Sequence, residues 1–231
     1  MDLSDKLAGL AREMSDAELA NYKLLLGMAA GGLARSGQPP ESGLESEAFS
    51  TAITAISALQ PHRHRVPPNG VVYRGRPSFV TDALLRALQE ESASLRHTAL
   101  RFDDHYVVSG APLAREIGFS TELNDLVSAH ADHVTPTAKA NYLYYDKPGM
   151  GIDPHVDNET FSLNAIMMLE HVYERDPSAL ILYPPRSPVE RIFLSPGEMI
   201  VMYADSITHA RERIRAGERV RIVAFGFQPL I

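Results

Sequence analysis

The sequence has 231 residues, of which 45% are hydrophobic, and it has no cysteine, which excludes disulfides, thiolate metal sites and cysteine nucleophiles. A formal net charge of -7 and a pI near 5.7 argue against a protein that binds nucleic acid through a basic face. The acidic start lacks the apolar core of a secretory signal, and no apolar run is long enough to cross a bilayer. We therefore expect a cytoplasmic protein with one globular domain and with neither a nucleic-acid nor a membrane partner.

Residues 1–65 are expected to form a helical N-terminal elaboration of this domain. The motif SDAE at 15–18 has the form of a capping box, which predicts a helix that ends near the glycines at 31–32. After a turn-rich connector, residues 45–59 again have the composition of a helix.

Residues 66–137 are expected to form a mixed region that supports the core. Residues 70–75 are typical of a strand, and leucines at helical spacing predict an amphipathic helix over 78–95. The basic residues near this strand are either a solvated surface, or Arg74 or Arg76 lies at the mouth of an active site and binds a substrate carboxylate.

A first HxD triplet, at 130–132, lies within the segment 120–134, whose apolar spacing predicts a helix. Residues two apart on a helix diverge by about 200 degrees, so this His and Asp could not share a metal ion. An HxD triplet alone is therefore a weak signal.

The motif Asp103-Asp104-His105 is expected to lie in a loop or rim, because adjacent acids on a strand point to opposite faces.

From residue 138 the chain changes to short apolar runs separated by Gly, Pro and Asp. This pattern is typical of an antiparallel sandwich or barrel, so we predict an α+β fold with a mainly β core, a jelly roll, over 138–231. The expected strands are 141–146, 155–158, 161–170, 178–185, 190–195, 197–204, 208–214 and 219–227.

The second HxD triplet is the candidate metal site. If its segment is extended, His155 and Asp157 leave the same face of one strand. His209, from a distant strand, would complete two histidines and one carboxylate with open positions, an arrangement that suits non-haem iron(II) and oxygen chemistry. Asn164 either lines this pocket or lies on the surface.

Two arginines of the last strand are candidate anion binders. Arg219 and Arg221 share one face, and Val220 and Ile222 take the other. If the arginine face lies inside the barrel, a buried guanidinium needs an anionic partner, which a dicarboxylate would supply. Arg219 opens the strand and offers a two-pronged donor to a carboxylate, and Arg221 is an alternative contact to this carboxylate or to the substrate.

These pieces resemble a known family, the 2-oxoglutarate and iron(II) dependent oxygenases, most closely their prolyl-hydroxylase-like branch. The resemblance lies in the aromatic strand 141–145, the motif HVDN at 155–158, the later His209, and the GER that ends at Arg219. The chain departs from that branch at Met167-Met168, near the place where a second tyrosine is often found.

The resemblance implies a double-stranded β-helix on which the N-terminal helices pack. It implies iron(II) bound by His155, Asp157 and His209, with dioxygen and 2-oxoglutarate as cosubstrates. It also implies that the distal carboxylate of 2-oxoglutarate pairs with Arg219 and that Tyr145 lines the cosubstrate pocket.

The leading functional hypothesis is a dioxygenase that hydroxylates an unactivated C–H of a small molecule, such as an amino acid or a biosynthetic intermediate, and releases succinate and carbon dioxide. One alternative is a protein side-chain hydroxylase of the prolyl type. Another is a cupin-like metal protein or isomerase that does not use 2-oxoglutarate, since cupins share the jelly roll. Nothing in the sequence indicates a particular oligomeric state.

Overall fold

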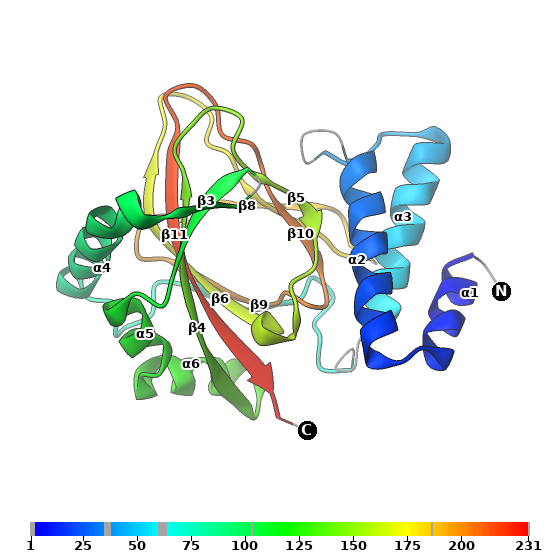
Figure 1. Ribbon diagram of the computed structural model, residues 1–231, viewed down its shortest axis with the longest axis horizontal. Helices are drawn as coiled ribbons and strands as arrows, with labels where there is room; N and C mark the ends of the chain where they lie inside the picture. The colour runs from blue at the N-terminus through cyan, green and yellow to red at the C-terminus, as the bar shows by residue number, and fades with distance from the viewer. Residues whose placement is uncertain (1–2, 35–37, 60–63, 103, 186, 231) are drawn as a thin grey trace.

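In a computed structural model, which describes residues 3–34, 38–59, 64–102, 104–185 and 187–230, two antiparallel β-sheets face each other and helices lie outside them (Figure 1). The larger sheet has seven strands in the order β1-β9-β6-β11-β4-β3-β2. Their bounds are β1 (Val71–Gly75), β2 (Leu100–Phe102), β3 (His105–Ser109), β4 (Val134–Tyr145), β6 (Leu163–Val172), β9 (Met199–Tyr203) and β11 (Arg219–Pro229).

The smaller sheet has four strands in the order β5-β10-β7-β8. From β4 onward successive strands change sheet, except for β7 and β8, and this alternation is the strand order of a jelly roll. The predicted α+β fold with a mainly β core is therefore confirmed. The bounds are β5 (Ile152–His155), β7 (Leu180–Tyr183), β8 (Glu190–Ile192) and β10 (Thr208–Arg211).

Three helices cover the outer face of the larger sheet: α4 (Asp82–Leu95), α5 (Pro112–Gly118) and α6 (Thr121–Ala131). Apolar side chains such as Leu88 and Leu123 pack there against Tyr142 and Phe225 of the sheet. The helix predicted over 78–95 begins later, because the Thr81 side chain accepts a hydrogen bond from a backbone N–H and caps α4.

The N-terminal helices lie on the other side of the barrel, next to β5 and β10 (Figure 1). They are α1 (Leu3–Leu10), α2 (Asp16–Leu33) and α3 (Gly43–Ala58). The predicted capping box is present, since Ser15 accepts from the Glu18 backbone and the Glu18 side chain accepts from the Ser15 N–H. Short 3-10 helices occupy 11–13, 96–98 and 159–161.

The position of α2 matters for the site, because α2 packs along β5, an edge strand of the smaller sheet. Its Gly27 and Gly31 face the backbone of β5 at His155 and Pro154. None of the helices in the described part of the chain is both long enough and apolar enough to span a lipid bilayer.

Candidate metal centre

Two histidines meet where β5 pairs with β10. His155 is the last residue of β5 and lies opposite His209 in the antiparallel register, with their ring centroids 4.4 Å apart. Asp157 is not on the strand, contrary to the sequence-based expectation, but in the loop that follows it. Its backbone N–H donates to the carbonyl of Ala204 at 2.9 Å, which fixes the loop beside the turn that leads to β10.

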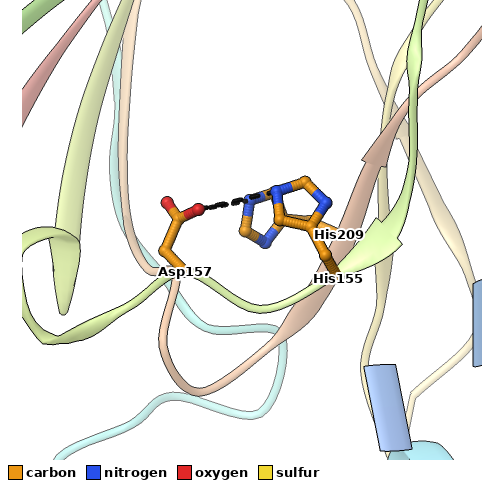
Figure 2. A group of neighbouring side chains, drawn as sticks. All are labelled: His155, Asp157 and His209. Carbon is orange, nitrogen blue, oxygen red and sulfur yellow. Dashed lines mark ion pairs between the residues drawn. The ribbon is translucent and has the colours of Figure 1, made fainter. Parts of the chain in front are cut away.

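The three side chains converge on one point (Figure 2). Asp157 Oδ1 lies 3.5 Å from Nε2 of His155 and 3.8 Å from Nε2 of His209. One ligand atom from each of the three residues lies within 4.8 Å of the other two, so the group could hold a metal ion. The structure thus brings together the three residues that the sequence singled out as candidate ligands.

Backbone carbonyls orient both imidazoles. Nδ1 of His155 lies 2.8 Å from the carbonyl oxygen of Asp153, and Nδ1 of His209 lies 3.0 Å from that of Ile207. Because a carbonyl can only accept, each Nδ1 carries the proton, and the lone pair of Nε2 points to the common centre. This second contact on each ring is typical of histidines that bind metals.

The electrostatics also suit a cation. Burial and the charge of His155 lower the pKa of His209 to about 4, so this imidazole is neutral at pH 7. Burial opposes charge on Asp157, but His209, His155 and a hydrogen bond from Asn164 together lower the pKa of its carboxyl. Burial also opposes charge on His155, yet its interactions with Asp157 raise its pKa above the ordinary value. Two imidazoles and one carboxylate are the donor set that a non-haem iron(II) centre uses, so the residues fit this ion.

Asn164 holds the other oxygen of the carboxylate. Its Nδ2 donates to Asp157 Oδ2 at 2.8 Å, which leaves Oδ1 directed at the two histidines. The Asn164 side chain lines the cavity, as one of the two sequence-based alternatives expected, but it contacts the metal-site carboxylate.

A cavity of about 100 Å³ between the sheets contains the three candidate ligands. Its other polar lining residues in the described chain are Asn164, Tyr145 and Arg211. Tyr145 is buried, and its hydroxyl makes no hydrogen bond with any residue that the structure describes. The rest of the lining is apolar and comprises Leu143, Ile152, Ile166, Met168, Leu180, Ile192, Leu194, Ile222 and Ala224.

Arg219 does not reach this cavity, so its expected position is corrected. Its side chain is 49% exposed and donates to Glu170 at 2.6 Å. In β11 it is Ile222 and Ala224 that face the cavity, so the arginine face of the strand is the outer one. The alternation of the two faces was predicted, and the condition that the arginine face lies inside the barrel is not met in the structure.

Arg221 and Arg74 also lie outside the cavity. Arg221 shares the outer face of β11 with Arg219 and has its guanidinium 3.3 Å from Glu170. Arg74 is exposed and donates to the carbonyl of Phe193 at 2.8 Å. Neither residue is placed to contact a substrate at the metal centre.

The first HxD triplet lies where the sequence suggested, and the motif Asp103-Asp104-His105 does so only in part. His130 is on α6, where its Nδ1 contacts the carbonyl of Leu126, and Asp132 follows the helix with a positive φ of 63°. Asp104 lies in a turn and accepts from Arg213 at 2.6 Å, whereas His105 is the buried first residue of β3 and not a loop residue; Asp103 lies outside the described residues.

Arg211 is the functional candidate that sequence reasoning missed. It lies two residues after His209 on β10, and residues two apart on a strand face the same way. The same spacing rule that was applied to His155 and Asp157 would have placed it beside His209.

No protein-family model matches this chain, and no curated protein sequence matches it. Solved structures do resemble it. The non-heme alpha ketoglutarate dependent epimerase SnoN from nogalamycin biosynthesis is 17% identical with a TM-score of 0.58, over 77% of this chain and 83% of SnoN. HygX from Streptomyces hygroscopicus, with nickel and 2-oxoglutarate bound, is 10% identical with a TM-score of 0.56, over 71% of this chain and 84% of HygX. A Pseudomonas putida prolyl-4-hydroxylase is 14% identical with a TM-score of 0.54, over 71% of this chain and 94% of the hydroxylase.

What these structures share with the chain is the fold. The chain has the double-stranded β-helix fold of 2-oxoglutarate and iron(II) dependent oxygenases. The similarity includes prolyl hydroxylases, so the resemblance seen in the sequence is confirmed at the level of fold.

Proposed function

We propose that this protein is an iron(II) and 2-oxoglutarate dependent dioxygenase that oxidises an unactivated C–H of a small molecule. The observation that carries the proposal is the convergence of His155, Asp157 and His209 at one end of an apolar cavity inside a double-stranded β-helix. Such a centre needs three protein ligands on one side and free positions on the other.

In this proposal His155, Asp157 and His209 hold the iron ion. The carbonyls that accept from the two Nδ1 atoms keep the imidazoles in the binding tautomer, and Asn164 keeps Asp157 Oδ1 toward the ion. Bound iron(II) would supply the oxidising chemistry, in which 2-oxoglutarate and dioxygen are consumed and succinate and carbon dioxide are released with the oxidised product. The lining beside these residues is mostly apolar and would limit the access of water to this chemistry.

Similar structures favour a small-molecule substrate. SnoN has been solved with nogalamycin RO and HygX with hygromycin B, both of which are small molecules. The Pseudomonas putida prolyl-4-hydroxylase supports a second candidate, a protein side-chain hydroxylase, at a comparable TM-score. A cupin-like protein that does not use 2-oxoglutarate is the third.

One assay separates the three candidates. Anaerobically purified protein is loaded with iron(II), given 2-oxoglutarate and air, and supplied with either a small-molecule panel or a peptide panel. We expect succinate that depends on iron and rises with a member of the small-molecule panel, and we expect none from Asp157→Ala. A rise with peptides alone would support the second candidate. Protein that binds iron but neither binds nor consumes 2-oxoglutarate would overturn the proposal in favour of the third.

A further inference from the structure

Arg211 is the one arginine or lysine that lines the metal-site cavity among the residues that the structure describes. It lies on β10 on the same face as His209, and only 7% of it is exposed. A cation therefore shares a mostly apolar cavity with the three candidate metal ligands.

This cation lacks a carboxylate partner. Five other arginines in the C-terminal part of the chain each have one within 4.0 Å: Arg191, Arg213, Arg215, Arg219 and Arg221. For Arg211 no carboxylate of a described residue lies within that distance. The carboxylates of Glu218 and Glu212 act on the guanidinium only from beyond that distance, so the place of a directly paired anion is open to a ligand.

The hydrogen bonds of Arg211 are also incomplete. Its Nη2 donates to the carbonyl oxygen of Ser178 at 3.0 Å and to Ser178 Oγ at 2.6 Å. Its Nε is buried and has no partner in the described chain. A guanidinium carries five N–H donors in a planar fork, so several remain for a bidentate partner.

Ser178, which bonds to the Arg211 guanidinium, is itself held by Glu218. Ser178 Oγ donates to Glu218, which also accepts from the backbone N–H of Ser178 and from Nε2 of His171 at 2.8 Å. The Glu218 side chain is only 3% exposed. These contacts hold Nη2 of Arg211 through Ser178. They leave Nε without a partner in the described chain, in a side chain that lines the cavity.

We infer that Arg211, and not Arg219, binds the distal carboxylate of a 2-oxo dicarboxylic acid whose 2-oxo end is at the metal centre. The inference rests on the proposed function. Tyr145 is the second donor available, because its ring lies 6.0 Å from the Arg211 guanidinium carbon and its hydroxyl has no protein partner in the described chain. Burial raises the pKa of Tyr145, so the hydroxyl keeps its proton and can donate.

Two ligands of the same length test this assignment. 2-Oxoglutarate and 2-oxopentanoate both have five carbons and the same metal-binding end, but only 2-oxoglutarate has a distal carboxylate. Their binding to manganese-loaded protein is measured by calorimetry without oxygen, so that no turnover is needed, and manganese affinity is measured separately. We expect the wild type to prefer 2-oxoglutarate by about 30-fold or more, as for other buried charge pairs.

The matched variants are Arg211→Leu and Arg219→Leu. We expect Arg211→Leu to bind both ligands within about threefold of each other, because it loses only the contact to the carboxylate. We expect Arg219→Leu to keep the wild-type preference, and both variants to keep their manganese affinity. A preference that survives in Arg211→Leu and disappears in Arg219→Leu would overturn the inference and leave the proposed function intact.

Arg211→Lys covers the case in which the leucine variant does not fold. A lysine keeps the charge but not the fork, so we expect about tenfold weaker binding of 2-oxoglutarate and unchanged binding of 2-oxopentanoate. Unchanged binding of 2-oxoglutarate would count against the inference. Wild-type protein that binds manganese but neither 2-oxo acid would instead refute the proposed function.

Discussion

At the scale of single residues, Asp157 depends on Asn164 for its orientation. The Nδ2 to Oδ2 hydrogen bond of 2.8 Å leaves one carboxylate oxygen for a metal ion. Removal of such an outer contact typically lowers metal affinity by about 10- to 100-fold. We therefore expect Asn164→Ala to bind manganese about 10- to 100-fold more weakly than the wild type in a competitive titration with a chelator. Asn69→Ala, which removes an amide bonded to Glu190, should bind manganese normally. Equal affinities for the two variants would show that Asn164 does not position Asp157.

Glu218 gives the protein a pH-dependent contribution to stability. Burial would raise the pKa of its carboxyl, but hydrogen bonds from Ser178, His171 and the backbone of Arg215 lower it below the ordinary value of 4.5. The stabilisation is therefore fully present above about pH 4.5 and is lost as the pH falls through the lower folded-state pKa.

We expect Glu218→Gln to lower the free energy of unfolding at pH 7 by about 1 to 3 kcal/mol, because four donors lose a charged acceptor. The difference from the wild type should shrink as the pH falls below 4.5. Urea unfolding at several pH values measures it, and Glu174→Gln, at an exposed carboxylate, is the control. A difference that stays constant with pH would contradict the assignment.

At the scale of elements, α2 supports the edge strand that carries His155. A Cβ added at Gly31 would lie 3.3 Å from the carbonyl oxygen of Pro154, whereas one added at Gly32, on the same helix, would meet nothing within 4 Å. Gly31 and Gly32 lie on the same helix and differ in this contact, so substitutions at the two positions form a matched pair.

We expect Gly32→Ala to stabilise the protein by about 0.5 to 1 kcal/mol, since alanine favours a helix over glycine. Gly31→Leu should destabilise it by about 1 to 3 kcal/mol relative to Gly32→Leu, because the larger side chain presses on β5. Manganese affinity should fall in Gly31→Leu alone, as measured by titration. If Gly31→Leu and Gly32→Leu were equally stable and bound metal equally well, α2 would not support the site.

The elements also show what a sequence can and cannot predict here. Capping residues, helical spacing and short apolar runs are local signals, so α2, α4, α6 and most strands were predicted within a few residues. Which face of β11 points inward was not predicted, because the side chains alternate in the same way whichever face meets the core. Only the packing of Ile222 against the cavity decides that Arg219 lies outside. Arg211 was missed because the resemblance to the family pointed to Arg219, and the rule that residues two apart on a strand share a face was not applied from His209.

At the scale of the whole molecule, the cavity that contains the three candidate metal ligands lies between the two sheets. The helices α4, α5 and α6 cover the larger sheet, α2 and α3 cover the smaller one, and the cavity holds the Arg211 side chain beside the three candidate ligands. In the proposed function this site binds a metal ion and a dicarboxylate. Ligands that bind the folded state alone must raise its stability.

Metal and 2-oxoglutarate at about 100 times their dissociation constants should each stabilise the fold by about 2.7 kcal/mol, or roughly 5 to 10 °C in melting temperature for a chain of this size. Scanning calorimetry without oxygen measures the shift with manganese alone and with both ligands. Asp157→Ala should lose both steps, because it removes a metal ligand. Arg211→Leu should keep the manganese step and lose most of the 2-oxoglutarate step, while Arg219→Leu should keep both. A 2-oxoglutarate step that is equally large in Arg211→Leu would mean that the buried cation is balanced by something other than the cosubstrate.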